Sequence, residues 1–270
     1  MSNSSRERVD EVDQYYRPIK TITAIGSYFF WFIAALSLCM LYIAHLGKPS
    51  FLVVLQSVFL VFVLVHFALS QISMLYLVPK AENMRRKQLL SDAFGTSLSH
   101  DCTSLYYNNQ CPPSIQRLGA NTMENAYFSK EIAGMMLTQR RIVIGGYIVI
   151  WLFAFSLRLN DLSVIMWITQ LLFSGNIVAQ WLNLEVLRAR YERVYDALHN
   201  HYLHEIGQDS QRAIASILDA FVLYEAAKSS AGVILSTKVF QKLNPSLTEK
   251  WSQIREELRI DFQQNVSTDR

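Results

Sequence analysis

Two long blocks of this sequence are almost free of charged residues, and this feature most constrains the fold. Residues 21–79 contain one charged side chain, Lys48, and residues 142–184 contain two, Arg158 and Asp161. Each block is about twice the roughly 20 residues that a helix needs to cross the hydrocarbon layer of a bilayer. We therefore expect two membrane hairpins. The alternative is a buried hairpin inside a soluble helical domain.

Each block is interrupted near its middle by a short polar turn, at residues 45–50 and 158–161. The apolar residues do not alternate with a period of two, so membrane-spanning strands are not expected. The pattern predicts an all-α integral membrane protein, in which two hairpins of transmembrane helices adjoin a cytoplasmic helical domain. The four predicted spans are Ile22–Leu46, Phe51–Val78, Ile142–Leu157 and Leu162–Trp181.

The distribution of basic residues predicts the topology. Of the 25 Lys and Arg residues, four lie in residues 1–21, eight in 79–141 and eleven from 182 onward, whereas each hairpin turn carries one. Because basic residues accumulate on the cytoplasmic side, both termini and the central segment are expected there, in a bacterial inner membrane. The first 21 residues are polar and mixed in charge, so no cleaved signal peptide is expected.

The predicted organisation has five parts. They are a cytoplasmic arm (1–21), a first transmembrane hairpin (22–78), a cytoplasmic central segment (79–141), a second transmembrane hairpin (142–181) and a cytoplasmic C-terminal helical region (182–270). A polar loop containing Gly95 and residues 106–113 divides the central segment. Asn121, followed by Glu124, suggests a capping box. The helices predicted outside the spans are Lys80–Leu90, Asn121–Leu137, Glu185–Tyr202, Ser210–Lys228 and, after Pro245, Leu247–Phe262.

Composition and motifs give no sign of catalysis. Half of the residues are hydrophobic (51%), 17% are charged and three are cysteines, which argues against a disordered chain and a disulfide scaffold. The sequence contains no phosphate-binding loop, HExxH or GxSxG motif. Cys102 and Cys111 with His100, and the cluster around His201, leave thiol chemistry or a metal open, but reduced thiols and a solvated helix are simpler. We expect no enzymatic activity, cofactor or metal.

A polar stripe runs along the fourth predicted span. Its members recur every three or four residues, which places them on one face of a helix. Polar groups in lipid are costly, so this face is expected to contact protein or water. Two explanations stay open, namely hydrogen bonds that hold a helix bundle together and the lining of a pore built by several subunits. The stripe consists of Thr169, Phe173, Asn176, Gln180 and Asn183.

The predicted cytoplasmic surface mixes basic and aromatic side chains. Guanidinium groups hold phosphates and aromatic rings stack on bases, so this mixture suits a nucleotide or a single-stranded oligonucleotide. Basic residues next to a membrane are also expected from topology and from attraction to anionic lipids. The predicted ligand-binding residues are Arg85, Arg86, Lys87, Arg117, Arg188, Arg190, Tyr106 and Tyr107.

Four sequence segments carry a family resemblance. They are residues 80–87 (KAENMRRK), 92–96 (DAFGT), 105–107 (LYY) and 121–128 (NTMENAYF). With two hairpins, a central segment and a helical tail, the chain resembles the SMODS-associating four-transmembrane family over residues 10–205. Members of this family are pore-forming effectors of bacterial anti-phage systems.

The resemblance implies a membrane effector that works with a nucleotidyltransferase, as in CBASS-like or Hailong-like systems. The enzyme would make a cyclic or linear oligonucleotide, and the effector would disrupt the inner membrane. A pore requires several copies of the chain, and we favour a tetramer in contact with membrane lipids. The sequence leaves open whether ligand opens or closes it, because either sign requires only that ligand binds one state better. The alternative function is a membrane-anchored scaffold that recruits a partner through its cytoplasmic helices.

Overall fold

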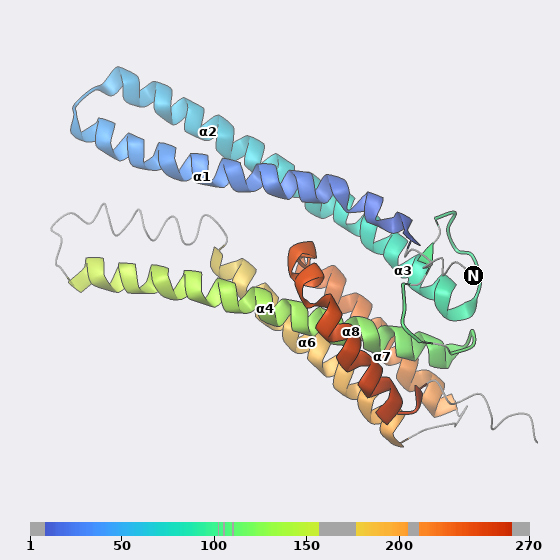
Figure 1. The fold of residues 1–270 in the computed structure, drawn as a ribbon. Coiled ribbons are helices and arrows are strands. Elements are labelled where there is room, and N and C mark those ends of the chain that lie inside the picture. The colour runs from blue at the N-terminus through green and yellow to red at the C-terminus, as the bar shows by residue number, and fades with distance from the viewer. Residues whose placement is uncertain are drawn as a thin grey trace, which may run out of the picture. The chain divides into compact units, whose positions relative to one another are not determined.

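Helices make up almost all of the chain that the computed structural model describes, namely residues 9–101, 103–104, 106–109, 111–156, 177–204 and 211–260 (Figure 1). The strands in these residues are one antiparallel pair of two residues each, β1 (Val9–Asp10) and β2 (Thr103–Ser104), and turns and short loops connect the elements. The expectation of an all-α chain is thus confirmed for these residues. The chain divides into two compact units. The hairpin unit comprises residues 13–81 and 142–179, and the helical unit comprises the remainder.

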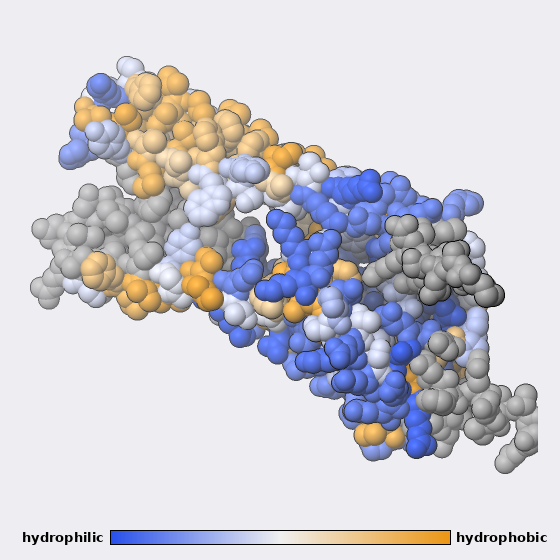
Figure 2. Space-filling model, viewed as in Figure 1, coloured by the Kyte–Doolittle hydropathy of each residue, from blue (hydrophilic) through white to orange (hydrophobic). Residues whose placement is uncertain are grey.

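Two apolar helices form the first hairpin. After a short 3-10 helix, η1 (Glu11–Tyr15), α1 runs over Arg17–His45 and α2 over Pro49–Ile72. A proline stands in the first turn of each helix, where its missing N–H costs no intrahelical hydrogen bond. Gly47 reverses the chain between them with a φ of +65°, a conformation that favours glycine. Both helices are long and apolar enough to cross a membrane. Figure 2 shows hydrophobic residues over both.

Aromatic side chains join the two helices of this hairpin. The ring of Phe62 on α2 lies 5.3 Å from Phe29 and 4.5 Å from Phe32, both on α1. Gly26 lies beside the imidazole of His66, with which a Cβ at position 26 would make ordinary van der Waals contact at 3.5 Å. His66 Nδ1 is buried there, with no hydrogen-bond partner among the residues that the structure describes. The hairpin therefore encloses a polar atom next to a glycine.

Helical structure continues beyond Val78, the residue at which the predicted second span ends. A π-helical turn, η2 (Ser73–Leu77), joins α2 to α3 (Val78–Phe94). Pro79 explains the wide turn, because its ring would clash with the carbonyl of residue 75 in a regular α-helix. The helical extension predicted over Lys80–Leu90 is confirmed.

Helix α4 (Ile115–Ser156) joins two elements that the sequence analysis treated separately. It contains both the predicted helix Asn121–Leu137 and the described part of the third predicted span. The capping box at Asn121 is wrong, since this residue lies inside the helix. Ser114 fills that role instead, and its Oγ accepts the backbone N–H of Arg117 at 3.2 Å. Burial in a tertiary hydrogen-bond network explains the polar residue at position 121.

The core of the helical unit lies among α4 and three further helices, α6 (Ile177–His204), α7 (Gln211–Ala231) and α8 (Thr237–Glu257). Buried residues recur every three or four positions along α6 and α7, as expected for helices with one face in a core. On α6 they are Leu184, Leu187, Tyr191, Val194, Leu198 and Tyr202. On α7 they are Ala213, Ile217, Ala220, Tyr224, Ala227 and Ala231. The predicted helices Glu185–Tyr202 and Ser210–Lys228 are confirmed over the described residues.

The last helix begins ten residues earlier than predicted. Ser236 caps α8, with its side chain accepting the N–H of Val239 at 3.4 Å. The prediction that a helix starts after Pro245 is wrong, because this proline lies inside α8. Val239 and Trp251, on either side of the proline, are both buried. Packing of this face offsets the backbone hydrogen bond that the proline removes. The fourth predicted span lies outside the described residues as far as residue 176.

Candidate functional site

Arg85 on α3 forms the most nearly complete anion-binding arrangement in the helical unit. Its guanidinium donates to both carboxylate oxygens of Asp10, at 2.9 and 3.0 Å. It also lies over the ring of Tyr106, 4.7 Å from the centroid. Both members of the ion pair are largely buried, with side chains 16% and 22% exposed. A planar fork held on an aromatic face is the geometry that binds carboxylate or phosphate.

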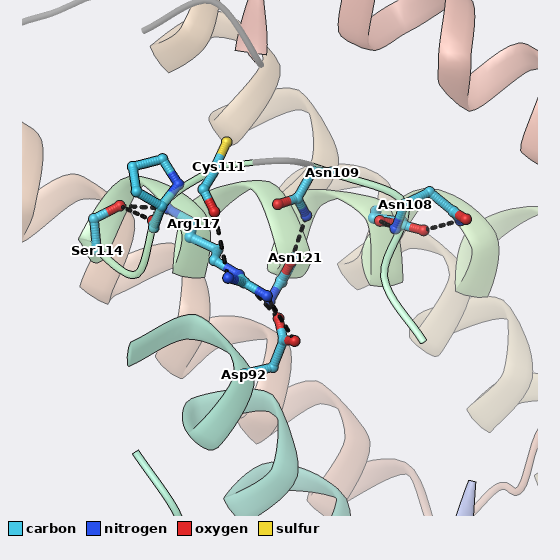
Figure 3. Close-up of polar contacts among 9 residues, drawn as sticks. Asp92, Asn108, Asn109, Cys111, Ser114, Arg117 and Asn121 are labelled. Atoms are coloured by element: carbon cyan, nitrogen blue, oxygen red, sulfur yellow. Dashed lines mark hydrogen bonds and ion pairs between the residues drawn. The ribbon is translucent and has the colours of Figure 1, made fainter. Parts of the chain in front are cut away.

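Arg117 on α4 forms a second bidentate pair. It donates to Asp92 at 2.8 and 3.1 Å, and to the carbonyl of Cys111 at 3.3 Å (Figure 3). Asn121 donates to the same Asp92 carboxylate at 2.8 Å and accepts from Asn109 at 2.6 Å. These contacts connect α3, α4 and the loop between them. Arg117 thus holds the loop to the helices.

Glu124 is a deeply buried carboxyl group one helical turn beyond Asn121. It accepts the backbone N–H of Asn108 at 3.2 Å and the side-chain amide of the same residue at 2.6 Å. Arg255 on α8 donates to the carbonyl of Asn108. Burial raises the pKa of Glu124 to about 7, although the bonds from Asn108 and the charge of Arg255 act in the opposite direction. This carboxyl group therefore changes charge near neutral pH.

A third bidentate pair connects α4 and α6 where the apolar blocks begin and end. Arg141 donates to both oxygens of Glu185, at 2.7 and 2.8 Å. The indole N–H of Trp181 donates to the same carboxylate at 3.0 Å. The hydrogen bond from Arg141 lowers the pKa of Glu185, so this carboxylate remains charged at neutral pH. The three side chains set the spacing of α4 and α6 at this level.

The remaining predicted ligand residues are dispersed over the helical unit. Arg86 donates to Asn83 on the same helix at 2.7 Å, and Lys87 is half-buried beside it. Arg190 donates to Ser230 on α7, and Arg188 lies against Gly134 on α4. Two helices, α3 and α6, contribute these side chains.

Tyr107 points into the core instead of offering a stacking surface. Its hydroxyl accepts from Asn125 at 3.1 Å, and its ring meets Tyr106 edge to face at 4.9 Å. Burial raises the pKa of this phenol well above its ordinary value. Whether any of the predicted residues contacts a phosphate stays a prediction.

The predicted polar stripe is described in part. Gln180 and Asn183 lie on α6 and are exposed, one on each side of half-buried Trp181. Their neighbours Leu184 and Leu187 turn into the core of the helical unit. Thr169, Phe173 and Asn176 lie outside the described residues. Gln180 and Asn183 share a helical face with Leu184 and Leu187, so this face passes from exposed to buried as α6 enters the core of the helical unit.

The acidic partners of these arginines do not stand out in the amino-acid sequence. Asp10 and Arg85 are 75 positions apart, and Asp92 and Arg117 are 25 apart. No helical spacing connects either pair. Glu124 was noticed only as part of a capping box. The signal available was its place in a run of residues that an amphipathic helix would bury, which requires a charged member to find partners.

Histidine and cysteine side chains do not gather into a metal site within the described ranges. His199 packs on Tyr195 with ring centroids 5.8 Å apart, while His201 is buried. Cys111 is also buried, and its thiol donates to the carbonyl of Ile260 at 3.3 Å. These residues serve packing and tertiary hydrogen bonding.

Comparison of the chain with protein-family models, characterised proteins and solved structures finds no match. The function is therefore argued from the site itself.

Proposed function

We propose that this chain is a multi-pass membrane protein with four spans and with the helical unit and both termini in the cytoplasm. The apolar surface of the α1–α2 hairpin carries the proposal. Pro49–Ile72 contains no buried residue, and large apolar side chains such as Trp31 and Phe67 are exposed. A hairpin with this surface is stable in lipid and prone to aggregate in water. Ile142, Val149 and Phe153 on α4 are exposed in the same way.

Within this membrane, copies of the chain assemble into a pore in which the α6 stripe faces the conduction path. The exposed amides of Gln180 and Asn183 support this placement, because amides at the edge of an apolar block require water or another polar group as partner. His66 supports it as well. A buried imidazole nitrogen with no partner, inside a hairpin that faces lipid, is typical of functional membrane segments.

The signal is a nucleotide or oligonucleotide made by a partner nucleotidyltransferase, and the setting is anti-phage defence, as the family resemblance implies. The Arg85 fork on Tyr106 supports a phosphate-bearing ligand, because this side chain is already oriented to donate to two oxygens of an anion.

Current through planar bilayers tests the pore. Purified wild-type protein is expected to give discrete currents, and the double substitution Asn176→Leu with Gln180→Leu is expected to change their conductance. Val186→Leu is the matched control, because it alters an exposed apolar position of the same helix. Unchanged conductance in the double variant would remove the stripe from the conduction path. No current under any condition, with or without nucleotides, would exclude a pore.

A second candidate function, a membrane-anchored scaffold, is favoured by helix α7. Leu218, Val222 and Leu223 are exposed on this helix of the helical unit, where water is the expected solvent. An apolar row of this kind fits a partner helix. In that case overexpression leaves the membrane potential of the cell intact, whereas a pore collapses it.

A further inference from the structure

We infer that Asp10 occupies the phosphate position of the Arg85 site, so that ligand and N-terminal strand compete for the same guanidinium. This inference rests on the proposed function in one respect, the phosphate-bearing ligand. The carboxylate of Asp10 makes two parallel hydrogen bonds to the Arg85 fork. Two oxygens of a phosphate group accept from an arginine in the same way. The chain thus supplies its own anion to this site.

Strand β1 couples this competition to a change in conformation, because Asp10 is part of the strand. Asp10 pairs with Thr103 and Val9 with Ser104, and the Asp10 side chain forms the ion pair with Arg85. A two-residue ladder is marginal on its own. Removing the ion pair therefore weakens the attachment of the strand itself, while Val12 beyond it is buried. We call Val9–Asp10, with its ladder and ion pair, the strap.

The contact between Arg85 and Tyr106 allows one anion to replace another while the arginine stays in place. Tyr106 lies under the Arg85 guanidinium at 4.7 Å, and this contact does not involve Asp10. A ligand phosphate can therefore replace the carboxylate while the arginine stays on the ring. Residues 11–16 alone separate Asp10 from the first residue of α1. Release of the strap therefore frees the chain directly before the first predicted span.

Hydrogen exchange of full-length protein in detergent micelles tests the strap. The probes are inorganic tripolyphosphate and a mixed-sequence single-stranded decanucleotide, which separate a free polyphosphate from a nucleic acid. Each probe that binds is expected to speed exchange of the amides in Val9–Asp10 and Thr103–Ser104. Probe binding that leaves these amides fully protected would overturn the inference.

Three substitutions sharpen the test. Asp10→Asn removes the competing charge and is expected to speed exchange without probe and to tighten probe binding at least about tenfold. Arg85→Gln also frees the strand, but it abolishes the response to either probe. Arg212→Gln is the control, because it removes the same charge from an exposed position on α7, outside the predicted ligand-binding residues. It is expected to behave as wild type.

The outcomes separate the strap from the pore. Equal probe affinity in wild type and Asp10→Asn would show that Asp10 does not occupy the ligand position. Binding of neither probe to wild type or Asp10→Asn at low salt would overturn the competition as well. Neither result depends on conduction, and absence of current in bilayers would refute the pore without changing the exchange measurements.

Discussion

The α1–α2 hairpin exposes the large apolar residue types that the helical unit buries. In the helical unit Leu, Ile, Tyr and Trp side chains fill the core, and partly buried arginines pair with carboxylates. In the hairpin, large apolar side chains are outside, and the polar atom His66 Nδ1 is inside. Hydrophobicity alone therefore does not predict burial in this chain. The solvent that surrounds each unit decides which face carries the apolar residues.

Two tryptophans give the largest contrast. Trp251 on α8 is 0% exposed and stacks on Tyr127, whereas Trp31 on α1 is 60% exposed. Trp251→Ala is expected to cost about 3–5 kcal/mol of unfolding free energy because it leaves a cavity in the core. Trp31→Ala is expected to cost less than about 1 kcal/mol in detergent. Guanidinium unfolding followed by circular dichroism measures both, and equal losses would remove the distinction between the two regions.

Replacing an exposed apolar residue by arginine tests whether lipid or water surrounds each helix. Leu64 on α2 and Val222 on α7 are 57% and 59% exposed, so a new side chain meets similar steric freedom at either position. Leu64→Arg is expected to cost about 2.5–3.5 kcal/mol of membrane insertion, the penalty of a cation near the centre of a span. Val222→Arg should change stability by less than about 0.5 kcal/mol. Insertion into microsomes measures the cost of Leu64→Arg, with Leu64→Ala as the control. Normal insertion of Leu64→Arg would contradict a lipid-facing hairpin.

Glu124 makes the stability of the helical unit depend on pH. Burial raises its folded-state pKa from 4.5 to about 7, so the folded state keeps a proton that the unfolded state releases. Its contribution to stability therefore falls as pH rises from about 4.5 to 7, by up to about 3 kcal/mol. Denaturant midpoints measured across this range test the slope. Glu124→Gln should flatten it, while an unchanged profile would assign the pH dependence to other groups.

Two glycines on α4 give the smallest effects, with opposite signs. A Cβ at Gly119 would overlap the Tyr202 hydroxyl and lie 3.3 Å from Ile217, whereas a Cβ at Gly145 would meet nothing within 4 Å. Gly119→Ala is expected to destabilise by about 1–3 kcal/mol. Gly145→Ala should stabilise by up to about 1 kcal/mol through helix propensity. Adding Tyr202→Phe to Gly119→Ala should recover part of the loss, and no recovery would locate the clash elsewhere.

The sequence predicts helices well where burial repeats along one face. Helix α7 is predicted from its amphipathic pattern, in which Ile217 is an apolar member that the structure buries, and α6 is predicted as the continuation of the fourth span. Prediction failed where tertiary contacts overrode local signals. Asn121 resembles a cap but bonds Asp92 and Asn109, and Pro245 resembles a helix start but lies inside α8.

The sequence predicts one kind of residue in the candidate site and misses another. The basic and aromatic members, such as Arg85 and Tyr106, stand out from their clustering beside a predicted span. Their carboxylate partners do not, because Asp10 approaches Arg85 through a strand pairing with no local sequence pattern. The result is a site whose cation is visible in the sequence and whose counter-ion appears only in the fold.

The Cys111 thiol has a consequence for measuring how this protein opens. It is buried and joins the loop before α4 to Ile260 at the end of the α8 turn, 149 positions away in sequence. A thiol reagent reaches it only when these two segments separate, so its rate of modification counts the opening events of the helical unit. Cys39 on α1 is exposed on the hairpin, so a membrane-permeant thiol reagent reaches it without such an event. The modification rate of Cys111 thus reports opening of the helical unit, and the rate of Cys39 serves as the reference for reaction without opening.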